Sequence, residues 1–423
     1  MKLIRTAPSL RFNFAWTFAG NVVYALCQWA LIAMMAKWGG AAMVGQYSLG
    51  LAVTAPVFML ANLQLRSIQA TDSERQYAFG DYMGLRLCTS VLSVAVIAAI
   101  MAMNRHSWEM TAVVLLIGCS KAIESVSDVV YGMLQQRERL DLIAKSLLVK
   151  GPLSLLTIAL LLWTTGSLVV CVAGLCAVWL LVLVAADMRY GARFETLKPR
   201  LRLQQLRSLA KLSFPLGIVM MLISLTDALP RYFIESILGT ETLGFYASLA
   251  YFIVAGSTVM GALGQTASPR LARYYAERRT ADYKRLLWRM GALAAGLGAA
   301  GTVVAAVAGK PILALVYTPE YAAYGPLLVW MMGYAAISYA ASCLGYGMTA
   351  ARLFAVQPYI FALTALASFL SLWQLVPLHG VYGAVYSLMI AGGVQAAASA
   401  AVVAYAVWKN RKREGDRFVA TTA

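Results

Sequence analysis

Few residues in this sequence are suited to bind metals or to act as nucleophiles. The 423 residues include only two histidines, and the six cysteines lie apart in apolar stretches without a Cys-x-x-Cys pair. Zinc and iron–sulfur sites need several such ligands at close spacing. The sequence also has no Gly-x-x-x-x-Gly-Lys loop, no Gly-x-Ser-x-Gly and no His-Glu-x-x-His. We therefore expect no metal, no cofactor and no ATP hydrolysis by this chain.

Charged residues are also scarce. They make up 13% of the chain, whereas 61% of the residues are hydrophobic and the mean hydropathy is +0.70. A soluble domain contains about 25% charged residues. Apolar runs of roughly 20 residues recur along the whole chain, and a helix of that length crosses about 30 Å of hydrocarbon. The composition predicts an all-α polytopic membrane protein.

We predict twelve transmembrane helices from these runs. Their ranges are 12–36, 44–64, 83–103, 109–131, 146–164, 167–186, 210–236, 243–265, 287–308, 324–347, 354–375 and 382–408. The first run is longer than the apolar region of a secretory signal peptide, which spans about 7–15 residues, so we expect no cleaved signal. The external loops are short, whereas membrane glycosyltransferases and polymerases need larger ones. We therefore expect a protein that is not an enzyme.

The basic residues report the orientation of these helices. Thirty of the 35 Lys and Arg residues fall on the side of the two termini, and four fall in the loops on the other side. This asymmetry predicts that both termini are cytoplasmic. The net charge of +17 therefore reflects topology, and we expect anionic membrane lipids and no nucleic acid as partners of the short basic loops.

Two short elements occur twice. YGMLQQR at 131–137 returns as YGMTAAR at 346–352, and VGQYSL at 44–49 returns as LGFYASL at 243–249. Each pair occupies equivalent helices of two six-helix halves that have the same orientation. Parallel repeats of this kind are typical of transporters that rock one bundle against the other around a central site.

The repeats predict four segments. They are an N-terminal six-helix lobe at 1–190, a basic cytoplasmic linker at 191–209, a C-terminal six-helix lobe at 210–408, and a basic cytoplasmic tail at 409–423.

The fourth predicted helix carries three charged residues on one face. Lys121, Glu124 and Asp128 follow at i, i+3 and i+7, and Tyr131 extends the same face. A charge at mid-bilayer costs about 2.5–3.5 kcal/mol, so these residues need a partner or a hydrated cavity. One interpretation is an internal ion pair that locks the bundle. The other, which we favour because one charge is left over, is a cavity wall that binds a charged group or relays a proton.

Three further groups of polar residues lie in or beside the predicted helices. Asp227, Arg231 and Glu235 follow one another in the seventh helix, where Glu235 is expected at the membrane boundary. Arg66 ends the second helix on the cytoplasmic side and could help to collect a phosphate. The first helix carries a stripe that lipid would not tolerate, and we expect it to face a hydrated cleft. That stripe consists of Asn13, Thr17, Asn21, Tyr24 and Gln28.

Several stretches resemble one transporter family. VGQYSLGLAVTAPVFMLANLQLR, ESVSDVVYGMLQQRER, PRYFIE and LGFYASLAY are similar to the Wzx-type polysaccharide flippases of the multidrug/oligosaccharidyl-lipid/polysaccharide (MOP) superfamily. The resemblance implies a MATE-like fold of two six-helix lobes. It also implies alternating-access transport of undecaprenyl-diphosphate-linked oligosaccharide across the bacterial inner membrane, for O-antigen of lipopolysaccharide, capsule or exopolysaccharide.

The resemblance further implies a cavity with cationic residues for the diphosphate and glycan. The substrate-binding candidates are Lys121, Arg231, Arg66, Asn21, Gln28 and Tyr131. The acidic residues leave room for antiport coupled to H⁺ or Na⁺, with Glu124, Asp128 and Asp227 as candidates. A polysaccharide polymerase and chain-length proteins are the implied protein partners, and we expect a monomer.

Two other functions stay open. A multidrug exporter of the same superfamily would bind organic cations through Asp128 or Asp227. The match of the quoted stretches to the polysaccharide branch argues against it. A non-transporting scaffold of a polysaccharide assembly complex is the second alternative, and the persistent polar stripes argue against that function.

Overall fold

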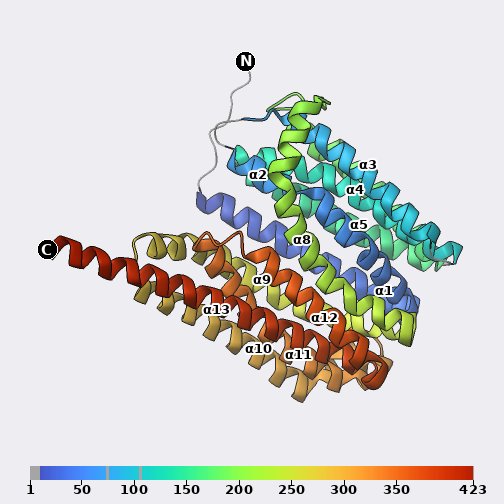
Figure 1. Cartoon of the computed structure of the whole chain (residues 1–423). Coiled ribbons are helices and arrows are strands. Elements are labelled where there is room, and N and C mark those ends of the chain that lie inside the picture. Colours follow the sequence, from blue (N-terminus) through green and yellow to red (C-terminus); the bar gives the residue numbers. More distant parts are fainter. Residues whose placement is uncertain (1–9, 73–75, 104–106, 423) are drawn as a thin grey trace. The chain divides into compact units, whose positions relative to one another are not determined.

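The computed structural model describes residues 10–72, 76–103 and 107–422. Residues 1–9 of the predicted N-terminal lobe lie outside the described part. The described residues form helices and connecting turns without a strand (Figure 1). The α-helices are α1 (Leu10–Asn62), α2 (Leu65–Thr71), α3 (Phe79–Met103), α4 (Trp108–Gln136), α5 (Leu140–Thr165), α6 (Leu168–Val182), α7 (Met188–Gly191), α8 (Leu203–Leu238), α9 (Thr240–Ala276), α10 (Thr280–Val316), α11 (Gly325–Ala350), α12 (Gln357–His379) and α13 (Val381–Thr422). A π-helix, η1 (Leu183–Asp187), follows α6, and a 3₁₀-helix, η2 (Pro319–Tyr324), precedes α11.

The prediction of about twelve membrane-spanning helices is confirmed. Ten stretches of the described chain are long and apolar enough to span a membrane. One of them covers α1, which consists of two helices joined at Gly40, where φ is 80°. Only glycine adopts that backbone conformation without strain. The twelfth helix is α4, which is long enough at 29 residues but carries the charges of Lys121, Glu124 and Asp128.

The repeated Tyr-Gly-Met elements end α4 and α11 in the same way. Each helix closes with a residue in the left-handed region, Glu138 (φ 56°) after α4 and Arg352 (φ 58°) after α11. The closing hydrogen bonds run from Arg139 N–H to Leu134 C=O at 2.8 Å and from Leu353 N–H to Met348 C=O at 3.0 Å. These are Schellman-type helix ends. Arg137 and Arg352 occupy the same position of the repeated element. Arg352 is the left-handed residue after α11, whereas Arg137 is the C-cap of α4, so α11 ends one position earlier in the element.

The chain divides into two compact units, and the division falls inside α8 between Ala228 and Leu229. In unit 1, residues 192–202 connect α7 to α8. Arg200 N–H donates to Gly80 C=O at 2.8 Å, and a Cβ on Gly84 would stand 2.2 Å from Arg200 O. The basic connection therefore lies directly on the first turns of α3. The predicted lobe boundary at 191–209 stays a prediction.

Unit 2 contains the rest of α8 and α9–α13, and α10 and α11 run side by side, as do α12 and α13 (Figure 1). An aromatic cluster joins the start of α9 to the connection between α10 and α11 in this unit. Tyr321 stacks on Tyr317 with centroids 4.8 Å apart, and Phe245 stacks on Tyr324 at 4.3 Å. Tyr317 OH also donates to Ser248 C=O at 2.9 Å. Aromatic side chains of this kind are favoured at membrane–water boundaries.

Candidate functional site

The main charged cluster of unit 1 forms where α1, α2, α3 and α4 meet. The Asp128 carboxylate on α4 accepts from Arg66 Nη1 of α2 and from Arg86 Nη2 of α3, each at 3.3 Å. The Arg66 side chain is 36% exposed and Asp128 is 30% exposed, whereas Arg86 is fully buried. We call these three residues the Arg66–Asp128–Arg86 cluster. With two guanidinium groups and one carboxylate, it keeps an excess positive charge.

A strained turn places Arg66 in this cluster. Leu63 and Gln64 link α1 to α2 with φ values of 52° and 51°. Residues other than glycine rarely adopt positive φ, and such strain persists only where surrounding contacts hold it. The turn brings Arg66 to α4, where its Nε donates to Gln135 Oε1 at 3.2 Å.

Arg86 is held from the other side by Asn62, the last residue of α1. Asn62 Oδ1 accepts from Arg86 Nη1 and also from Ser125 Oγ of α4, the latter at 2.8 Å. Arg86 Nε has no hydrogen-bond partner among the described residues. Arg86 lies near the start of the predicted third helix, 83–103, and its burial at 0% exposure was not predicted from the sequence.

The charged face of α4 contains the internal ion pair of the first interpretation, whereas the cavity wall of the second interpretation stays a prediction. Lys121 Nζ donates to Glu124 Oε2 at 2.8 Å, which is the predicted internal ion pair. Lys121 Nζ also lies 5.6 Å from the centre of the Trp179 ring on α6. The third charge, Asp128, is neutralised by arginines of α2 and α3 and not by its own helix. The face therefore carries two separate charged groups.

Tyr131, the last residue of the predicted face, belongs to a buried network that the sequence did not reveal. Its hydroxyl lies 2.8 Å from Ser146 Oγ and donates to Asp187 Oδ2 at 3.3 Å. Lys150 Nζ lies 4.0 Å from Asp187 Oδ2. The predicted fifth helix, 146–164, includes Lys150, but the predicted sixth helix, 167–186, ends one residue before Asp187. The spacing of Ser146, Lys150 and Ser154 along α5 is the signal that could have found the network.

The remaining predicted residues lie on α1 and α8. Asn21 is exposed and Gln28 is half-buried on α1. Asn13, at the start of the same stripe, is buried and donates to Glu138 C=O at 2.7 Å, so this end packs on the turn after α4 and does not face a cleft. On α8, Asp227 is exposed at the end of unit 1, and Arg231 is half-buried at the start of unit 2. Their roles stay predictions.

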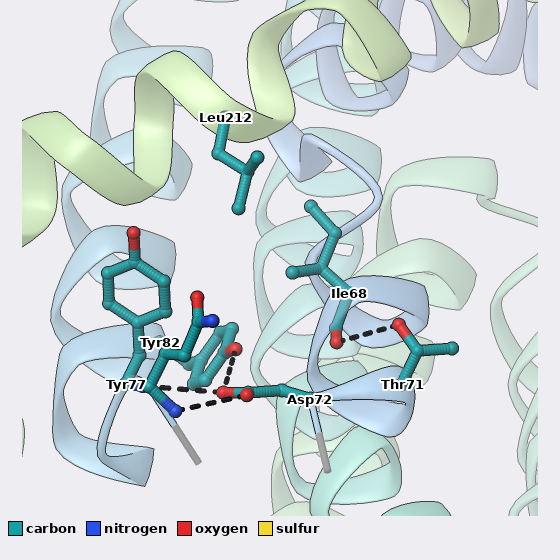
Figure 2. A pocket seen from close by; sticks show the side chains of 7 residues that line it. Ile68, Thr71, Asp72, Tyr77, Tyr82 and Leu212 are labelled. Atoms are coloured by element: carbon teal, nitrogen blue, oxygen red, sulfur yellow. Dashed lines mark hydrogen bonds between the residues drawn. The ribbon is translucent and has the colours of Figure 1, made fainter. Parts of the chain in front are cut away.

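A cavity of about 270 Å³ lies beside α2 at Asp72 (Figure 2). The Asp72 carboxylate accepts from the backbone N–H groups of Gln76 (3.0 Å) and Tyr77 (3.3 Å) and from Tyr82 OH (3.1 Å). These contacts satisfy the carboxylate with donors from Gln76, Tyr77 and the α3 residue Tyr82. This cavity does not include the Arg66–Asp128–Arg86 cluster, which is the better candidate for an anionic ligand.

Comparison with known proteins fits a transporter of this architecture. The family model described as polysaccharide biosynthesis protein matches residues 10–275. The chain is 24% identical over 319 residues to the capsular polysaccharide biosynthesis protein CapF of Staphylococcus aureus, and the match covers 75% of this chain and 80% of CapF.

Solved structures share the fold. A MATE family multidrug resistance transporter of the MOP superfamily, in an outward-facing conformation, superimposes with a TM-score of 0.63 at 12% identity over 94% of this chain and 95% of its own. A MOP superfamily transporter from Pyrococcus furiosus superimposes with a TM-score of 0.61 at 13% identity, over 93% of this chain and 94% of its own. A mutant of the Vibrio cholerae MATE transporter VcmN superimposes with a TM-score of 0.61 at 16% identity, over 94% of this chain and 96% of its own. The chain is a multi-pass membrane protein with the MOP transporter fold, and it belongs to the polysaccharide biosynthesis protein family.

Proposed function

We propose that this protein is a flippase for undecaprenyl-diphosphate-linked oligosaccharide in the bacterial inner membrane. It would act by alternating access during synthesis of a surface polysaccharide, as a monomer with both termini in the cytoplasm. The polysaccharide biosynthesis family and the MOP fold support transport of such a substrate. The observation that carries the proposal is the partly exposed Arg66–Asp128–Arg86 cluster with its excess positive charge.

This cluster suits a diphosphate because guanidinium groups bind phosphate oxygens in a bidentate manner. Without substrate, Asp128 supplies the counter-charge, so that the buried Arg86 is not left unpaired. A diphosphate can take over contacts of Arg66 while Asp128 remains with Arg86. Exchange of one anion for another avoids exposing an unpaired charge to hydrocarbon.

The same exchange offers a route to ion coupling. A diphosphate beside Asp128 places two anions next to one another, which favours binding of a proton or a cation by the carboxylate. Asp128 is therefore our first coupling candidate, with Glu124 and Asp227 behind it. Lys121 and Tyr131, which lie on α4 as Asp128 does, are proposed contacts of the substrate, as are Asn21, Gln28 and Arg231 elsewhere.

Export of organic cations is the less favoured function. An exporter of cations needs a carboxylate that is free to receive the cation. Asp128 lies between two guanidinium groups at 3.3 Å each, which repel a third positive charge. We regard the scaffold function as less favoured too, because it gives no reason for charged groups inside the membrane-spanning helices.

Deletion of the gene in its own host tests the proposal. We expect loss of the surface polymer and a build-up of polyprenyl-linked repeat units, whose sugars would identify the substrate. Complementation with Arg66→Ala should fail, whereas Arg273→Ala should restore the polymer, because Arg273 is a 62% exposed arginine at the end of α9. Normal polymer with raised sensitivity to cationic drugs would instead show a multidrug exporter.

A further inference from the structure

Unit 1 also contains a buried ion pair apart from the Arg66–Asp128–Arg86 cluster, formed by Lys150 of α5 and Asp187 of η1. The Lys150 side chain is 1% exposed and the Asp187 side chain is 0% exposed, with Nζ and Oδ2 4.0 Å apart. Removing two charges from solvent costs several kcal/mol for each ion, and a contact of this length does not recover the cost by itself. Further contacts must therefore stabilise the pair, and they indicate its role.

The additional contacts of Asp187 converge on one hydroxyl group. Ser146 Oγ donates to Asp187 Oδ1 at 2.5 Å, and Tyr131 OH donates to Asp187 Oδ2 at 3.3 Å. Lys150 Nζ approaches Tyr131 OH to 3.5 Å. The π-helical turn of Leu183–Asp187 ends at this aspartate, and such wide turns occur often at functional sites. Together these groups fix the hydroxyl end of Tyr131.

The ring of Tyr131 contacts Arg66 of the Arg66–Asp128–Arg86 cluster. Arg66 Cζ lies 5.6 Å from the ring centre, and Lys150 Nζ lies at the same distance. Both are within the range of cation–π contacts. The buried network therefore holds the hydroxyl of Tyr131. The ring of Tyr131 contacts the guanidinium of Arg66, which pairs with Asp128. A continuous set of contacts joins Asp187 to Arg66.

We infer that Lys150 and Asp187 are positioning residues that act on Arg66 through Tyr131. An arginine carries much rotamer entropy, and fixing it before the ligand arrives increases affinity. The buried pair therefore maintains the geometry of the Arg66–Asp128–Arg86 cluster without touching a ligand. The identity of that ligand, a diphosphate, rests on the proposed function, whereas the effect on Arg66 does not.

The first test measures Arg66 directly. The full-length protein in lipid nanodiscs is treated with phenylglyoxal, and modification of each arginine is followed by mass spectrometry. Tyr131→Phe keeps the ring and most of the volume but removes the hydroxyl that Asp187 holds. We expect Tyr131→Phe and Asp187→Asn to speed modification of Arg66 about two- to fivefold, the factor set by one exposed cation–π contact. Arg273, at 62% exposure, is the internal control and should not change. An unchanged rate at Arg66 in both variants would overturn the inference.

The second test uses inorganic pyrophosphate as the probe and a double-mutant cycle. We expect Asp187→Asn to weaken pyrophosphate binding about tenfold, as loss of an orienting outer contact does at other sites. In an Arg66→Ala background the same change should have no further effect, because coupled residues are non-additive. Equal losses in both backgrounds would show that the pair only stabilises the fold. Unchanged pyrophosphate binding by Arg66→Ala would refute the proposed headgroup site but leave the phenylglyoxal result to decide whether Arg66 is positioned by the pair.

Discussion

The substitution Asp128→Asn tests the electrostatics of the Arg66–Asp128–Arg86 cluster. It removes the counter-charge of Arg86, which is fully buried, and of Arg66, which is 36% exposed. Leaving a buried charge unpaired costs about 3–5 kcal/mol, whereas an exposed pair contributes about 0–1 kcal/mol. Because Asp128 is itself 30% exposed and Asn62 still contacts Arg86, we expect the free energy of unfolding to fall by about 2–3 kcal/mol.

Two further variants test whether the loss of stability comes from the unpaired charge of Arg86. Arg66→Ala should cost less than about 1 kcal/mol, since its pair is partly exposed. The double substitution Arg86→Met with Asp128→Asn removes both charges of the buried pair. It should recover stability to within about 1 kcal/mol of the unmodified protein, because an apolar side chain of similar volume replaces a buried ion well.

The assay is denaturant-induced unfolding of the purified protein in micelles, followed by tryptophan fluorescence and compared among the four proteins. A double variant that is less stable than Asp128→Asn alone would refute the reasoning. The reasoning would also be refuted if Arg66→Ala lowered the free energy of unfolding as much as Asp128→Asn does. The exposure of the charged side chains would then not determine how much stability is lost.

Three further predictions concern transport and packing. Lys121→Ala should abolish polymer export while immunoblotting shows normal protein in the membrane; full export would remove Lys121 from the substrate site. Asp128→Asn should change the dependence of transport on the proton or sodium gradient in membrane vesicles, and an unchanged dependence would exclude Asp128 as the coupling residue. Gly84→Ala should lower unfolding stability by about 1–3 kcal/mol, because its Cβ would meet Arg200 O at 2.2 Å. The matched control Gly296→Ala, with open space at the Cβ, should be neutral or raise stability by up to about 1 kcal/mol; equal effects of the two alanines would contradict the close packing of residues 198–200 on α3.

The sequence predicted the helices well because lipid imposes one strong requirement. Each crossing needs a long apolar run, and this signal does not depend on tertiary contacts. It located α4 despite its charges, and it separated the two halves of α1 on either side of Gly40. The pairing of Lys121 with Glu124 was also predictable, since both residues lie on one helix at a spacing of three.

The partners of Asp128 and the buried network were less predictable. Arg86 and Arg66 come from two other helices, and their distances to Asp128 depend on how α2 and α3 pack on α4. Asp187 directly follows the sixth predicted helix, 167–186, yet it ends the π-helical turn η1 and is fully buried. Asn13 shows the opposite error, because a polar residue predicted to face water instead binds the turn after α4.

The central claim is movement of the lipid-linked oligosaccharide between leaflets, and reconstitution measures it most directly. The purified protein would be placed in liposomes with the undecaprenyl-diphosphate-linked oligosaccharide extracted from the deletion strain, and external periodate would report the glycan on the outer leaflet. We predict that the protein makes the inner-leaflet glycan reactive as well, and that Arg66→Ala does so much more slowly than Arg273→Ala. Reactivity confined to the outer leaflet in the presence of folded protein would contradict the flippase account.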